Sequence, residues 1–106
     1  HLALDEVVAD ARTFTDEVAE RATAVGVSPD GRSKTVSSSS ALDEVSAEFQ
    51  SDDKVVLVMT EALEAAIKRL RSNIAKVDSD PVTEDLLIGI SARLEQLHWM
   101  WQAQSA

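Results

Sequence analysis

In three long stretches of the chain, apolar residues recur three or four positions apart, and a chain can bury such residues together only as helices. The stretches run over about 2–25, 53–77 and 83–104, and each supplies one apolar face. Strand-like alternation of apolar and polar residues is absent elsewhere. The sequence therefore predicts an all-α protein.

The connections between these helices carry turn and cap signals. Gly26 directly follows the first helix and favours its termination, because glycine adopts the positive φ of a helix C-cap. Residues 27–40 are predicted to form a loop, and a short amphipathic helix is predicted at 42–49. Pro81 separates the last two long helices, and Thr83 is the predicted N-cap of the final one.

Three long helices and one short helix make an incomplete antiparallel bundle, because long helices usually pack in fours around one core. The sequence starts with His1-Leu2-Ala3-Leu4, which offers no capping residue before the helical pattern. We therefore expect the first helix of a four-helix bundle to precede His1. Residues 1–106 are expected to form the remainder of a single domain.

The composition excludes several classes of function. The chain has no cysteine, which removes disulfides, thiolate metal sites and cysteine nucleophiles. Its formal net charge is −9, from 19 acidic and 10 basic residues, so this segment is unsuited to hold a nucleic acid by itself. An acidic chain attracts cations instead. No apolar run approaches the roughly 20 residues of a membrane span, so no membrane association is expected.

One arc of the first helix carries side chains that ligate metals. His1, Asp5, Asp16 and Glu20 fall at about 0°, 40°, 60° and 100° around a helix axis. Imidazole and carboxylate groups are both common metal ligands. The four residues form two pairs with i, i+4 spacing, and each pair can contact one ion.

The two pairs are too far apart to share one ion, because their centres are about 22 Å apart along a helix. A second copy of the helix, packed antiparallel about a two-fold axis, would place His1 and Asp5 of one copy beside Asp16 and Glu20 of the other. The small side chain of Ala11, near the midpoint, permits close approach of the helices. The two-fold axis predicts two identical sites per dimer.

The same residues have an ordinary structural interpretation. Acidic side chains on a helix usually form a solvated face, and Glu6, Asp10 and Glu17 lie on the same helix. The spacing alone leaves both interpretations open.

The segments His1-Leu-Ala-Leu-Asp5 and Asp16-Glu-Val-Ala-Glu20-Arg21 resemble the core signature of the Dps family, the mini-ferritins also known as DNA-binding proteins from starved cells. The turn Ser28-Pro29-Asp30-Gly31 and the terminal Leu94-Glu95-x3-Trp99 are also similar to that family, and the resemblance covers essentially the whole chain. It implies a ferritin-like four-helix bundle with a short connecting helix. The first bundle helix, which holds a further iron-ligand histidine in the family, is absent from this chain.

The resemblance implies an iron-oxidising and iron-storing ferroxidase that consumes Fe(II) and hydrogen peroxide and so protects DNA from oxidative damage. His1, Asp5, Asp16 and Glu20 would form the iron site at the dimer interface, where His1 is a ligand and Asp5 either binds the metal or orients a ligand. Asp16 and Glu20 would be the catalytic residues supplied by the second subunit, with Glu20 bridging. The family's shell of twelve subunits implies a homo-oligomer, and its location would be the cytoplasm, with association to the nucleoid.

Acidic residues also gather at the start of the last helix, where Asp78, Asp80, Glu84 and Asp85 occur. The resemblance implies that Asp78, Asp80 and Asp85 line a pore, since a ring of carboxylates would concentrate Fe(II). The alternative is that these acids stabilise the N-terminus of the helix.

The aromatic end of the last helix has a structural interpretation. His98 lies on its apolar face and is expected to be a core or interface histidine rather than a metal ligand. Trp99 and Trp101 lie about 200° apart around the axis, so one is expected in the core and the other at a contact with another subunit.

Two further functions remain open at this point. One is a nucleoid-associated protein that protects DNA without significant ferroxidase activity and binds DNA through tails not present in this chain. The other is a non-enzymatic helical module for oligomerisation. The spacing of the candidate ligands and the prediction of a closed shell distinguish the ferroxidase from the second alternative.

Overall fold

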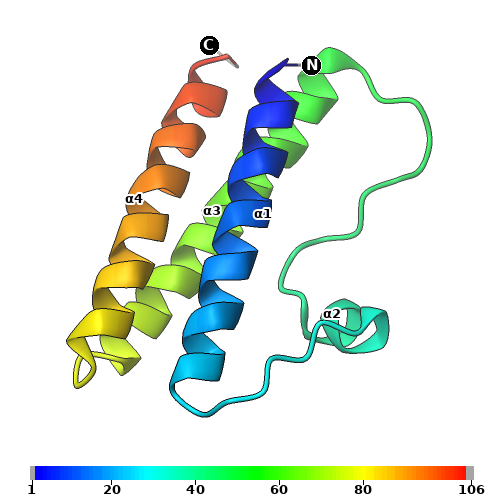
Figure 1. Ribbon diagram of the computed structural model, residues 1–106. Coiled ribbons are helices and arrows are strands. Elements are labelled where there is room, and N and C mark those ends of the chain that lie inside the picture. Colours follow the sequence, from blue (N-terminus) through cyan, green and yellow to red (C-terminus); the bar gives the residue numbers. More distant parts are fainter. Residues whose placement is uncertain (1, 105–106) are drawn as a thin grey trace. The chain divides into compact units, whose positions relative to one another are not determined.

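The computed structural model describes residues 2–104 and contains four helices and no strand in that range, which confirms the all-α class. The helices are α1 (Leu2–Ala24), α2 (Ser33–Ser39), α3 (Asp52–Lys76) and α4 (Pro81–Ala103) (Figure 1). The chain divides into two compact units, His1–Ser40 and Ala41–Ala106, so that α1 and α2 belong to the first unit and α3 and α4 to the second.

The end of α1 confirms the prediction made from Gly26. This glycine has a φ of 90°, in the left-handed region that favours glycine. Its backbone N–H donates to the carbonyl of Thr23, and the N–H of Val27 donates to the carbonyl of Ala22 at 2.8 Å. These two bonds form a Schellman motif, which satisfies carbonyl groups that the helix end would otherwise leave unpaired.

The short helix lies earlier in the chain than predicted. Residues 42–49 contain no helix, and α2 instead occupies 33–39, inside the predicted loop. The carboxylate of Asp30 organises the chain at the start of α2. It accepts hydrogen bonds from the backbone N–H and the guanidinium of Arg32 and from the hydroxyl of Thr35.

The prediction at 42–49 is wrong because a helix this short gains little from its own hydrogen bonds and needs a surface that buries its apolar stripe. The stripe stays exposed, and Phe49 is fully accessible to solvent. The hydroxyl of Ser46 accepts the N–H of Glu48, a local bond that competes with helical hydrogen bonding.

α3 and α4 pack side by side and form the core of the second unit (Figure 1). The connection between Lys76 and Pro81 is short, which makes the two helices antiparallel neighbours. The buried apolar side chains are Leu63 from α3, and Ile90, Leu97 and Trp101 from α4. The apolar stripes predicted for the second and third long helices therefore face each other.

Both helices of this pair begin with a side-chain cap. The hydroxyl of Ser51 accepts the N–H of Lys54 at the start of α3. At the start of α4 the carboxylate of Asp80 accepts the N–H of Thr83 at 3.3 Å and its hydroxyl at 2.6 Å. The prediction of Thr83 as the cap is therefore wrong. Pro81 fits the first turn of the helix, because its missing N–H would have no partner there.

Candidate metal centre

α1 carries three of the four predicted ligands on its surface. Asp5, Asp16 and Glu20 belong to this uninterrupted helix and are all exposed, whereas His1 lies outside the described residues. Because the helix is continuous from Leu2 to Ala24, the angular positions derived from the spacing apply to all three carboxylates.

The three described candidate ligands do not form a cluster with one another or with other described residues in a single copy. Within residues 2–104, no three side chains of His, Asp or Glu are arranged to hold an ion together. Asp16 and Glu20 are one turn apart, whereas Asp5 lies about 16 Å away along the helix axis. Within the described residues, one copy therefore presents these three carboxylates as an exposed row along α1.

A shallow hollow marks α1 at the predicted centre of helix pairing. It is lined by Val8, Ala11, Arg12, Thr15 and Asp16. The Thr15 hydroxyl donates to the carbonyl of Ala11 at 2.7 Å, so this polar group is satisfied within the helix. The small Ala11 side chain leaves a depression between neighbouring ridges, which is the shape that receives a side chain of another helix.

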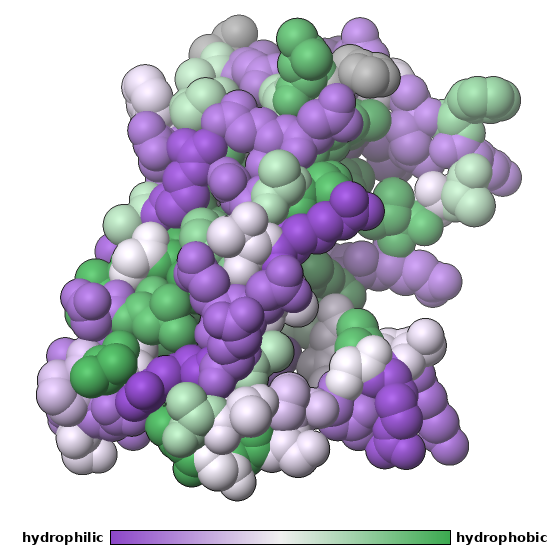
Figure 2. Space-filling model, viewed as in Figure 1, coloured by the Kyte–Doolittle hydropathy of each residue, from purple (hydrophilic) through white to green (hydrophobic). Residues whose placement is uncertain are grey.

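No described residue of α1 is buried, so its apolar stripe and its carboxylates are both accessible surface. Figure 2 shows hydrophilic residues over much of one face of the molecule, with hydrophobic residues scattered among them. None of the helices in the described part of the chain is both long and apolar enough to cross a lipid bilayer.

The acidic residues near the start of α4 have different surroundings. The carboxylate of Asp80 is engaged with Thr83 as the helix cap, which is the structural alternative predicted for this cluster. Asp78 and Asp85 are exposed, and Glu84 lies in the first turn of the helix, where a negative charge is favourable. A pore formed by these residues would need other subunits and stays a prediction.

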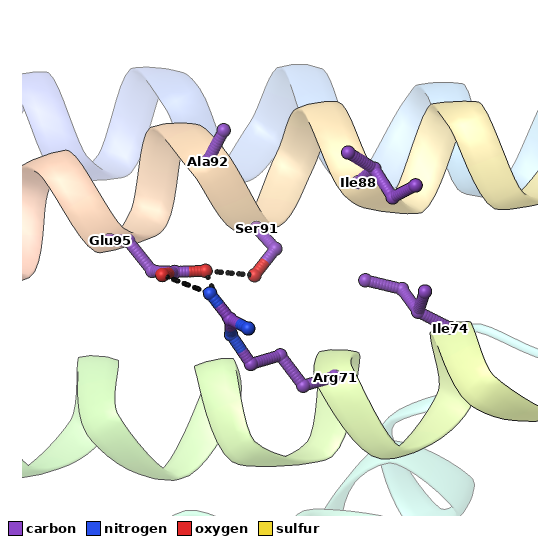
Figure 3. Close-up of a pocket in the computed structure, with 6 residues that line it drawn as sticks. All are labelled: Arg71, Ile74, Ile88, Ser91, Ala92 and Glu95. Atoms are coloured by element: carbon purple, nitrogen blue, oxygen red, sulfur yellow. Dashed lines mark hydrogen bonds and ion pairs between the residues drawn. The ribbon is translucent and has the colours of Figure 1, made fainter.

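A polar cluster that the sequence analysis missed joins α3 to α4. The Arg71 guanidinium donates to both carboxylate oxygens of Glu95, and the buried Ser91 hydroxyl donates to Glu95 at 2.6 Å (Figure 3). Hydrogen bonds from Arg71 and then from Ser91 hold the pKa of the Glu95 carboxyl below its ordinary value. The i, i+4 spacing of Ser91 and Glu95 was visible in the sequence, but the pairing with Arg71 depends on the register of the two helices.

This cluster lines one end of a cavity of about 310 Å³, and Ile74 and Ile88 line the other end (Figure 3). The Arg71 charge is neutralised by Glu95, and no candidate metal ligand other than Glu95 lines the cavity. The cavity is therefore a packing feature of the helix pair, and α1 remains the candidate metal centre.

The aromatic residues of α4 divide as predicted from their angular separation. Trp101 is 4% exposed and belongs to the core, whereas Trp99 is 67% exposed. His98 is half-buried, and its Nε2 atom has no hydrogen-bond partner among the described residues. A contact of Trp99 with another subunit stays a prediction.

Comparison with known proteins identifies several relatives. The family described as Ferritin-like domain matches residues 1–106. DNA protection during starvation protein 2 of Deinococcus radiodurans is 34% identical over 91 residues, which cover 85% of this chain and 38% of that protein. DNA protection during starvation protein 2 of Bacillus anthracis is 30% identical over 105 residues, which cover 97% of this chain and 71% of that protein.

A solved structure, that of Dps92 from Deinococcus radiodurans, has a TM-score of 0.93 and 32% sequence identity and covers 97% of this chain. The chain spans 63% of that structure's length, and only 38% of the length of the Deinococcus relative first compared above. The similarity confirms the ferritin-like fold that the sequence resemblance implied.

Proposed function

This chain belongs to the Dps family of ferritin-like proteins, and on that premise we propose that it oxidises and stores iron, with Fe(II) and hydrogen peroxide as substrates. The proposal concerns the whole protein, of which the 106 residues carry the candidate site. In the overall reaction, two Fe(II) ions each lose one electron, and the O–O bond of one hydrogen peroxide molecule breaks. With two protons taken up, two water molecules form.

The observation that carries this proposal is the row of exposed ligand-type side chains on one arc of α1. Asp5, Asp16 and Glu20 are exposed, and the sequence places His1 one turn before Asp5. Mixed imidazole and carboxylate donors suit both Fe(II) and Fe(III), which an oxidation site must accommodate in turn. The donor set therefore fits the proposed substrate.

Two copies of α1, antiparallel about a two-fold axis, would complete the site. His1 and Asp5 of one copy would then lie beside Asp16 and Glu20 of the other, and the symmetry repeats the site. The hollow around Ala11 at the centre of α1 is consistent with close approach there. In this arrangement Glu20 is the candidate bridging ligand, and Asp16 binds the metal next to it.

We further propose a homo-oligomeric shell of twelve subunits in the cytoplasm, in which each chain contributes a single ferritin-like domain. Asp78, Asp80 and Asp85 would lie at a pore that concentrates Fe(II). Asp80 would do so while its carboxylate caps α4. The protein would protect DNA by removing Fe(II) and peroxide, since a net charge of −9 disfavours direct DNA binding by this segment.

The proposal is tested by the rate of Fe(II) oxidation by peroxide in the full-length protein. Asp16→Ala and Glu20→Gln should each lower the rate at least about ten-fold, because removal of even an outer partner of a metal ligand costs 10- to 100-fold. Glu17→Gln is the matched control, since Glu17 is exposed on the same helix but lies outside the arc. Unchanged rates and iron loading in both site variants would refute the assignment.

The assembly is tested separately by native mass spectrometry of the same protein. A closed particle of about twelve chains supports the proposed shell, given the symmetry rules of oligomers. A monomer or an isolated dimer would remove mineral storage from the proposal.

A further inference from the structure

A positive charge lies within the candidate metal arc of α1. Arg12 falls at about 20° around the axis of α1, between the angular positions of His1 and Asp5. The only other cation of α1, Arg21, falls at about 200°, on the opposite side of the helix. A cation among metal ligands is unexpected, because it opposes the binding of a divalent ion.

The structure places the Arg12 side chain next to one of these ligands. Arg12 and Asp16 are one turn apart and line the same hollow on α1. Arg12 is exposed, and within residues 2–104 it forms no ion pair, with Asp16 or with any other acid. Its guanidinium is therefore available to a carboxylate that another copy brings to the hollow.

The proposed antiparallel pairing supplies that carboxylate. With the two-fold axis between Asp10 and Ala11, Arg12 of one copy is level with Ala9 of the other. Asp5 of that other copy is one turn from Ala9. Arg12 would thus be one turn from its own Asp16 and one turn from the second copy's Asp5, which are level with each other and are two of the carboxylates assigned to one site.

The charge of the pair explains why a cation is needed there. Each copy brings Asp5, Asp16 and Glu20 to the arc, so two copies gather six carboxylates, and the two Arg12 side chains are the only lysines or arginines in the arc. Without metal, the carboxylates that the two copies bring to one site repel each other, and this repulsion opposes assembly of the pair. A guanidinium can bind two carboxylates at once through its fork of N–H donors.

We propose that Arg12, which forms no ion pair with the described residues of a single copy, is the counter-ion of the metal-free site in the assembled pair: there it binds Asp16 of its own helix and Asp5 of a second copy, and Fe(II) displaces it on binding. The inference rests on the proposed function and assigns to Arg12 a positioning role in it. It predicts two effects of opposite sign when Arg12 is neutralised, namely a less stable metal-free assembly and tighter metal binding.

The test is calorimetric melting of the assembled protein under argon, with a chelator or with Fe(II). Arg12→Gln should lower the melting temperature of the metal-free protein by several degrees, and Fe(II) should restore most of the loss, because a ligand that binds the folded state stabilises it. The dissociation constant for Fe(II) should fall by up to about ten-fold, since a unit charge about 6 Å from a divalent ion opposes its binding even in water.

Two variants separate this role from a general loss of stability. Arg12→Lys keeps the positive charge but lacks the fork of N–H donors, so it should keep the wild-type affinity for Fe(II) and recover only part of the melting temperature that Arg12→Gln loses. Arg21→Gln makes the same charge change on the opposite side of α1 and should leave the stabilisation by Fe(II) unchanged. The inference is overturned, and the proposed function stands, if Arg12→Gln lowers the melting temperature equally with and without Fe(II). The same holds if Arg12→Gln and Arg21→Gln have the same melting temperature and the same dissociation constant for Fe(II). If the wild type binds no Fe(II), the proposed function fails and the role of Arg12 fails with it.

Discussion

The two ends of the chain use helices of equal length in different ways. α1 has 23 residues and buries none of them, whereas α4, also 23 residues long, buries Ile90, Ser91, Leu97 and Trp101. The candidate ligands lie on α1, and α4 makes the core with α3. The two helices therefore differ in burial: α4 contributes to the core that it shares with α3, whereas the described side chains of α1 remain accessible.

The largest expected effect is on the core of the α3–α4 pair. Leu97 is 1% exposed, and Leu97→Ala should lower the free energy of unfolding by about 2–5 kcal/mol, through lost burial and the cavity left behind. Val82→Ala, at a residue of α4 that is 60% exposed, should change it by less than about 0.5 kcal/mol. Urea denaturation measures both. Equal effects would show that this core does not dominate the stability.

Two glycines, one in each unit, sharpen the comparison. Substitution by alanine should lower the free energy of unfolding at the first glycine and raise it at the second. Gly26→Ala should cost about 1–2 kcal/mol, since its φ of 90° is unfavourable for a residue with a Cβ atom. Gly89→Ala, within α4, should stabilise by up to about 1 kcal/mol through helix propensity. An added Cβ meets no atom within 4 Å at either glycine, so backbone conformation alone separates them. Thermal melting measures both variants, and melting temperatures that shift in the same direction would contradict this prediction.

The smallest expected effect concerns pH and the Arg71–Glu95 pair. The folded state lowers the pKa of Glu95, so the pair stabilises the protein above the ordinary glutamate pKa, and this contribution is lost as the pH falls through the lowered value. Glu95→Gln should remove that part of the pH dependence, whereas Glu61→Gln, at an exposed residue of α3, should retain it. The effect should be small and weakened by salt, because the pair is solvent-accessible. Unfolding followed between pH 3 and pH 7 at two salt concentrations checks the sign, and an unchanged profile in Glu95→Gln would refute it.

Local sequence pattern was sufficient for the long helices. Helical hydrogen bonds join residues four positions apart, so spacing, Gly26 and Pro81 located the three helices to within a few residues of the observed ends. The angular argument also predicted that Trp99 and Trp101 could not both be buried. The arc of Asp5, Asp16 and Glu20 follows from the same arithmetic once α1 is a continuous helix.

Contacts between distant residues decided the rest. The short helix forms at 33–39, where Asp30 organises its start, and is absent at 42–49, where the apolar stripe stays exposed. Which tryptophan enters the core, and the pairing of Arg71 with Glu95 across 24 positions, depend on the register between α3 and α4. Local spacing determines which side chains share a face, because helix geometry is the same everywhere. Packing determines which face is covered, because burial depends on the segment that lies opposite.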